Sequence, residues 1–101
     1  MNSYCTLLKI TPEFYKTYFK KNKKVKVSDF LGKHVEQMGG KIVHSAMMIG
    51  GEYNILMIID TPDISNLVAG MAKIFSTNAI EHYKVYTLVN SEQEEKILKL
   101  I

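Results

Sequence analysis

The chain has 101 residues, 47% hydrophobic and 23% charged, so a disordered or collagen-like chain is excluded and one packed domain over residues 1–101 is expected. Its net charge is +3, but residues 1–41 hold nine lysines and three acids, whereas residues 42–101 hold four lysines and seven acids. Five lysines fall within residues 20–26, and the sequence contains no arginine. Because nucleic-acid binders rely on the bidentate contacts of arginine, nucleic acid is a disfavoured partner. A solvated lysine loop is the favoured interpretation, and an electrostatic binding patch is the alternative.

The cysteine count and the apolar runs predict the compartment. Cys5 is the sole cysteine, which excludes an internal disulfide and favours a reducing, cytoplasmic location. The first residues lack a basic start followed by an apolar core, so no signal peptide is expected. The longest apolar run, Ile55–Ile59, is far shorter than the roughly 20 residues that span a bilayer, so we expect a soluble protein.

The first predicted element is a central strand over residues 3–10. A helix follows to about residue 21, because Thr11 can cap it, Pro12 suits its first position and Glu13 suits its first turn. Aromatic residues at helical spacing predict a stripe that packs toward the core, formed by Phe14, Tyr15, Tyr18 and Phe19.

A second helix and a hairpin are predicted after the lysine run. Ser28 is the expected cap of a helix over residues 29–38, which ends at a glycine pair. Residues 41–49 and 52–60 are strand-like, and the Gly50-Gly51 pair between them is typical of a two-residue primed turn. Such a turn would place His44 opposite Met57. One face of the hairpin would then carry Ile42, His44, Ala46, Met48, Tyr53, Ile55, Met57 and Ile59, and the other Val43, Ser45, Met47, Ile49, Asn54, Leu56 and Ile58.

The rest of the chain predicts a helix, a strand and a final helix. Thr61-Pro62-Asp63 repeats the earlier helix start, residues 81–88 form a fourth strand, and Ser91 with Glu94 resembles a capping box. This order fits an α+β, ferredoxin-like β-α-β-β-α-β fold with a four-stranded antiparallel sheet of order 4-1-3-2 and an added C-terminal helix. Helices can cover one sheet face only, so the second apolar face predicts a homodimer.

The histidines lack the spacing of a metal motif, so no metal site is expected. His34 is interpreted as a boundary residue of its helix, and His82 as half of an exposed pair with Glu81. His44 would be the one ionisable residue on its predicted strand face, so it either lines a cavity or is a satisfied core histidine.

Glu52, Tyr53 and Asn54 follow the glycine turn. The glycines are explained by positive φ and Tyr53 by packing at the sheet edge, but a ligand pocket is the alternative. In that pocket Tyr53 and His44 would supply polar groups, with Tyr4 or Tyr86 from neighbouring strands. No dinucleotide, phosphate-loop, nucleophile-elbow or paired-carboxylate pattern is present, so no cofactor is expected and no catalytic residue is assigned.

The chain resembles the small GYD-domain proteins of the dimeric α/β-barrel superfamily. The resemblance covers nearly the whole chain and rests on residues 9–13, 38–41, 51–54 and 61–63, with Asn54 standing where the family's name motif has Asp. It implies a single GYD-like domain and a homodimer whose two sheets face each other, and it implies no established activity.

Three functions follow as hypotheses. The first is a non-catalytic dimeric ligand-binding or accessory protein, whose ligand would be small and apolar or aromatic. The second is a small cofactor-independent oxygenase or isomerase with a cavity between sheet and helices, supported by fold analogy alone. The third is an electrostatic binder that acts through Lys20–Lys26.

Overall fold

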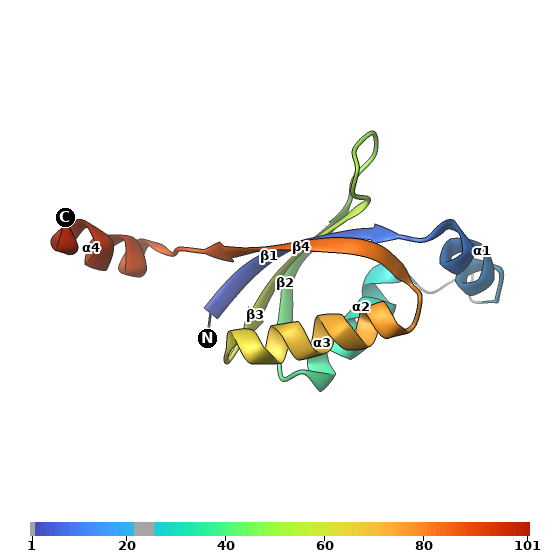
Figure 1. Ribbon diagram of the computed structural model, residues 1–101, viewed down its shortest axis with the longest axis horizontal. Helices are drawn as coiled ribbons and strands as arrows, with labels where there is room; N and C mark the ends of the chain where they lie inside the picture. Colours follow the sequence, from blue (N-terminus) through green and yellow to red (C-terminus); the bar gives the residue numbers. More distant parts are fainter. Residues whose placement is uncertain (1, 22–25) are drawn as a thin grey trace.

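The computed structural model describes residues 2–21 and 26–101 and, within helix α1, the side chains up to residue 18. Most of the lysine run at Lys20–Lys26 therefore lies outside the described residues. In chain order the elements are β1 (Asn2–Ile10), α1 (Pro12–Lys21), α2 (Val27–Gln37), β2 (Lys41–Met47), β3 (Ile55–Thr61), α3 (Ile64–Ser76), β4 (Ile80–Leu88) and α4 (Ser91–Leu100) (Figure 1).

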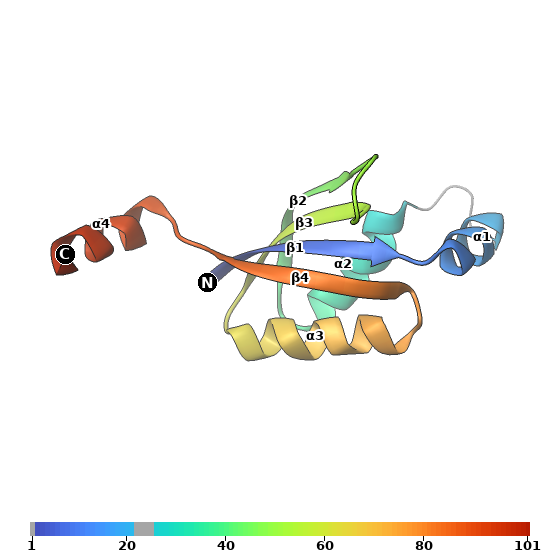
Figure 2. The same ribbon diagram turned by 45° about the horizontal axis from the view of Figure 1, so that its top comes forward.

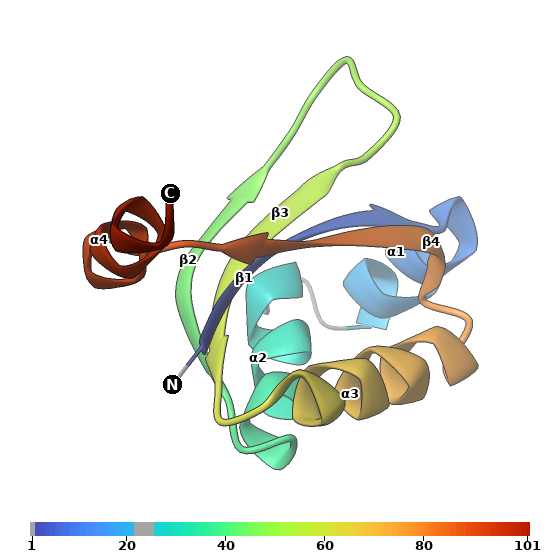
Figure 3. The ribbon, with the colours of Figure 1, turned by 60° about the vertical axis from the view of Figure 1, so that its left-hand side comes forward.

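The strands form a four-stranded antiparallel sheet in the order β2-β3-β1-β4. This is the predicted ferredoxin-like α+β arrangement, with β1 in the interior between β3 and β4 as expected. Helices α2 and α3 lie together on one face of the curved sheet, while α1 and α4 lie at opposite ends of the molecule (Figures 1, 2 and 3).

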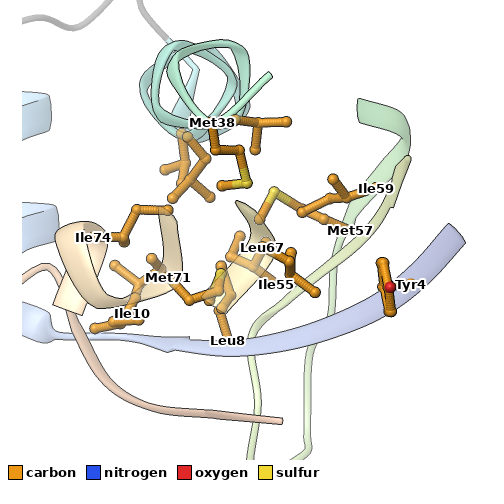
Figure 4. Packing of buried hydrophobic residues seen from close by; sticks show 14 residues of the cluster. Tyr4, Leu8, Ile10, Met38, Ile55, Met57, Ile59, Leu67, Met71 and Ile74 are labelled. Carbon is orange, nitrogen blue, oxygen red and sulfur yellow. The ribbon is translucent and has the colours of Figure 1, made fainter. Parts of the chain in front are cut away.

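The core fills the space between the sheet and helices α2 and α3 (Figure 4). Alternate residues of β1 and β3 are buried because successive strand side chains point to opposite faces. Within the core α3 approaches α2 closely at Gly70, where a Cβ atom would collide with the Met38 side chain. The buried hydroxyl of Thr6 donates to the Met57 carbonyl at 3.1 Å, so this polar group is satisfied. The core residues are Tyr4, Leu8, Ile10, Val27, Leu31, Val35, Met38, Ile55, Met57, Ile59, Leu67, Met71, Ile74 and Ile80.

The aromatic side chains of α1 pack against the start of α2 as well as the core. Phe14 stacks on Tyr18 at 5.1 Å between ring centroids and lies 4.8 Å from the ring of Phe30 in α2. Phe14 and Tyr15 also contact the buried cluster, and burial raises the pKa of the Tyr15 phenol above its usual value. The predicted packing role of Phe14 and Tyr15 is thus confirmed, whereas the side chain of Phe19 lies outside the described residues.

Helix α1 begins as predicted, because the Thr11 hydroxyl accepts a hydrogen bond from the Phe14 N–H at 3.2 Å. The other predicted caps are wrong by one or two residues. Helix α2 begins at Val27, where the Asp29 carboxylate accepts from the Lys26 N–H at 3.1 Å, so Ser28 is not its cap. Helix α3 is capped by Asp63 rather than by the threonine two residues earlier.

The hairpin differs from the prediction in its turn and in its register. Strands β2 and β3 end at Met47 and begin at Ile55, so seven residues, 48–54, connect them instead of two. A bulge between Ile42 and His44 then shifts the register, so that His44 pairs with Ile58 rather than Met57. Because one inserted residue reverses the direction of every later side chain, the predicted face assignment of β2 is wrong beyond Ile42. Gly50 has φ +93°, as expected for a glycine turn.

Candidate functional site

The sheet face opposite α2 and α3 is an apolar surface, here named the open face. At its centre Cys5 and Leu7 of β1 lie beside Ile58 and Leu56 of β3, and all four are half-buried. The pairing of the four strands gives two adjacent cross-strand rows, His44–Ile58–Cys5–Tyr86 and Ala46–Leu56–Leu7–Lys84. In the described part of the chain no helix lies over this face (Figure 3).

One end of the open face carries a polar cluster of Glu52, Tyr53, His82 and Lys84, here named the polar end. The rings of Tyr53 and His82 meet edge to face at 5.1 Å, and the Lys84 ammonium lies 6.0 Å from the Tyr53 ring centroid. His82 Nε2 is shielded from solvent, and the Glu52 carboxylate lies 3.6 Å from it. A cation near an aromatic face, next to an imidazole and a carboxylate, can orient a small aromatic or polar molecule.

Asn54 holds the polar end against the sheet. Its side-chain Oδ1 accepts from the Ile10 N–H at 2.8 Å, and its Nδ2 donates to the Ile10 carbonyl at 3.3 Å. Its backbone N–H donates to the Leu8 carbonyl at 2.9 Å. The side chain therefore continues the hydrogen bonding of β1 beyond the start of β3 and ties the residue next to Tyr53 to β1.

The structure brings together some of the predicted site residues and separates others. Glu52 and Tyr53 share the polar end, and Asn54 supports it. Tyr4 points to the opposite face and is 3% exposed within the core, so it does not contribute to a pocket with Tyr53. Tyr86 and His44 lie on the open face at the two ends of one row, with two strands between them.

The predicted core position of His44 is wrong. His44 is exposed on β2, the edge strand, and pairs with Ile58 rather than Met57. The bulge before it causes this, because His44 follows the inserted residue and turns to the open face.

His82 and Lys84 were not predicted as site residues. His82 was expected to pair with Glu81, but the structure places it beside Glu52, thirty positions earlier. Their spacing of two within β4 was the available signal, because residues two apart in a strand share a face.

A concavity lies on the helix side, between α2 and α3. It measures about 390 Å³ and is lined by His34, Gln37, Met38, Gly39, Asn66, Ala69, Gly70 and Lys73. Asn66 Nδ2 donates to the Met38 carbonyl at 3.0 Å, and the His34 Nδ1 lies 3.1 Å from the Phe30 carbonyl. The Asn66 bond joins α3 to the end of α2, whereas the His34 contact lies within α2. His34 is half-buried beside this concavity, which agrees with its interpretation as a boundary residue.

Among the described residues, no group of three or more His, Cys, Asp or Glu side chains is arranged to hold a metal ion. Within the same ranges, none of the helices has both the length and the apolar character needed to cross a membrane.

No protein-family model and no curated protein matches the sequence. Solved structures match the fold. Ribosomal protein S6 of the 30S subunit from Thermotoga maritima has a TM-score of 0.62 at 16% identity, covering 97% of each chain. FFRP-DM1 has a TM-score of 0.55 at 12% identity over 88% of this chain and 100% of that one. An uncharacterized NIPSNAP domain protein from Burkholderia xenovorans has a TM-score of 0.50 at 14% identity, covering 90% and 95%. At these identities the likeness shows the ferredoxin-like fold alone.

Proposed function

We propose that the chain is a homodimeric, non-catalytic ligand-binding or accessory protein of the cytoplasm, related to the GYD-domain proteins. Its two copies meet through their open faces, and each polar end binds a small apolar or aromatic molecule. The observation that carries the proposal is the open face itself, an apolar surface at the centre of the sheet that no described helix covers.

The chemistry of the open face supports a second copy as its partner. Leu7, Leu56 and Ile58 are apolar side chains on the interior strands, where a monomer would leave them partly in water. A standard interface buries about 800 Å² on each partner, and apolar area contributes about 25 cal/mol per Å². Lysine and histidine lie at the margins rather than the centre, as in interfaces with a polar rim.

The packed core argues against the hypothesis of a small oxygenase or isomerase. That hypothesis places its cavity between sheet and helices, where the structure has a dense cluster of buried side chains. A ligand at the polar end needs no such cavity. The lysine run remains an alternative binding element. Lys26, whose side chain is described, is exposed at the start of α2.

The interface is tested by Leu56→Glu with Val68→Glu as the matched control. Leu56 lies on the open face, whereas Val68 is an exposed apolar residue on the outer side of α3. Leu56→Glu should raise the dimer dissociation constant at least tenfold, because it places a charge in a desolvated apolar contact. Val68→Glu should leave it unchanged. Equal effects of the two variants, or no effect of Leu56→Glu in a folded protein, would contradict the interface.

The ligand site is tested with anilinonaphthalene sulfonate, an anionic aromatic dye. Its rings can stack on Tyr53 and its sulfonate can pair with the Lys84 ammonium. Tyr53→Ala should reduce dye binding several-fold, because it removes the ring and the cation contact that depends on it. Tyr83→Ala on the helix face serves as the control and should bind the dye like wild type. Equal binding by wild type and Tyr53→Ala would remove the polar end from the proposal.

A further inference from the structure

Helix α4 stands apart from the body of the protein. It continues beyond the end of β4 and points away from the sheet (Figures 1 and 2), and none of its residues is buried. The radius of gyration is 15.0 Å and the longest dimension 53 Å, compared with a radius of about 13 Å for a compact chain of this length. Helix α4 with Ile101, here named the arm, therefore makes the molecule longer than a compact chain of the same length.

The arm is also amphipathic. Its exposed apolar residues are Ile97 (45%), Leu98 (63%), Leu100 (88%) and Ile101 (96%). At helical spacing Glu94 lies three and four residues before Ile97 and Leu98, on the apolar side. Glu95 lies three and four residues before Leu98 and Lys99, at the border with the polar side. Isolated helices shorter than about 12–15 residues are marginal in water. A ten-residue helix with one apolar side therefore needs a surface to pack on.

The start of α4 is closed by a reciprocal cap. The Asn90 side chain accepts from the Gln93 N–H at 2.8 Å, and the Gln93 side chain accepts from the Asn90 N–H at 3.0 Å. Only two residues, Val89 and Asn90, connect β4 to the helix. With this short connection α4 lies beyond the end of β4, outside the sheet of its own chain (Figures 1 and 2).

We propose that α4 is an exchanged arm, which in the homodimer packs against the polar end of the second copy's open face. The inference rests on the proposed function, because it needs that face to be a dimer surface. Charge supports this placement. The arm begins with three acids, Glu92, Glu94 and Glu95, and the polar end presents Lys84 and His82 with Lys9 as the cross-strand neighbour of His82. The one carboxylate of the polar end, Glu52, lies 3.6 Å from His82.

Symmetry makes the exchange reciprocal. Strand β4 begins near the polar end with His82 and Lys84, and it ends at Leu88, where the arm starts. A two-fold axis parallel to the sheets and perpendicular to the strands places the end of β4 in one copy over the beginning of β4 in the other. Each arm then reaches the other copy's polar end, so that a second chain contributes to each proposed ligand site.

The test is a charge-reversal cycle in the full chain, with Glu94→Lys, Lys84→Glu, the double variant and Glu95→Lys as the matched control. Dissociation constants are measured by analytical ultracentrifugation. Glu94→Lys and Lys84→Glu should each weaken the dimer about tenfold, and the double variant should return to within about threefold of wild type. Glu95→Lys should change the constant less than twofold, because Glu95 is turned further from the apolar side of the arm than Glu94.

Each result decides between the two proposals. A monomeric wild-type protein contradicts both the dimer and the arm. A dimeric wild type in which Glu94→Lys and Glu95→Lys behave alike overturns the arm and leaves the dimer standing. Weakening by both single variants without recovery in the double variant overturns the contact with the polar end. If Glu94→Lys lowers stability without changing the dissociation constant, α4 packs on its own chain and the exchange is wrong.

Discussion

Asn54 offers a prediction whose size can be worked from the structure. Its side chain makes two hydrogen bonds to the Ile10 backbone, one as acceptor at 2.8 Å and one as donor at 3.3 Å. Each such bond contributes about 1 kcal/mol net. Asn54→Ala should therefore lower the free energy of unfolding by about 2 kcal/mol, which corresponds to roughly 10 °C in melting temperature for a domain of this size.

Asn54→Asp, which introduces the residue that GYD-domain proteins have in their name motif, should also lower the stability. A carboxylate keeps the acceptor for the Ile10 N–H, but it loses the donor and places an oxygen against the Ile10 carbonyl. We expect a loss of about 1–3 kcal/mol at neutral pH. Chemical denaturation followed by circular dichroism at one fixed protein concentration measures both variants, with Asn2→Asp at the exposed start of β1 as the charge control. Stability within about 0.5 kcal/mol of wild type for Asn54→Ala would refute the bridging role.

Four further predictions concern the rest of the molecule. Gly70→Ala should destabilise by about 1–3 kcal/mol, because the added Cβ collides with the buried Met38 side chain. Gly32→Ala, whose Cβ would lie 3.8 Å from the nearest side-chain atom, should be neutral or stabilising, and thermal melts of the two variants test this. Burial raises the pKa of Tyr15, so the neutral phenol is favoured in the folded state and the free energy of unfolding should fall as pH rises above about 10. Denaturation curves at high pH should show a smaller fall in the free energy of unfolding for Tyr15→Phe than for wild type. His44→Ala should shift the free energy of unfolding by less than about 0.5 kcal/mol because the side chain is exposed, and a drop of more than 1 kcal/mol in a chemical melt would contradict that. Replacing the five lysines of residues 20–26 by glutamine should change the melting temperature by less than about 5 °C, since like charges in water contribute little to stability.

The strand order could be read from the sequence because each element carries a local signal. The alternation of β1 and the Thr11 cap define the first strand and helix, and the remaining elements follow in the expected order. Cap positions were less certain where two good caps stand side by side. Asn90 and Ser91 each have a suitable partner three residues later, and the structure uses Asn90 with Gln93.

The register of β2 could not be read in the same way. Residues from Val43 to Ile49 are small or apolar at nearly every position, so either face can be buried and the pattern does not detect the bulge. That inserted residue moved His44 from the predicted core face to the open face. Glu52 and Tyr53 of the polar end were predicted as site residues, but His82 and Lys84 were not. Glu52 and His82 meet only through the pairing of β1 with β4 and the course of residues 48–54.

The dimer is tested most directly by the mass of the wild-type protein in solution. Multi-angle light scattering of the full chain at micromolar concentration should give twice the chain mass of 11.5 kDa, because the apolar centre of the open face favours association. A mass of one chain across that concentration range would contradict the dimer, and with it the function proposed for this protein.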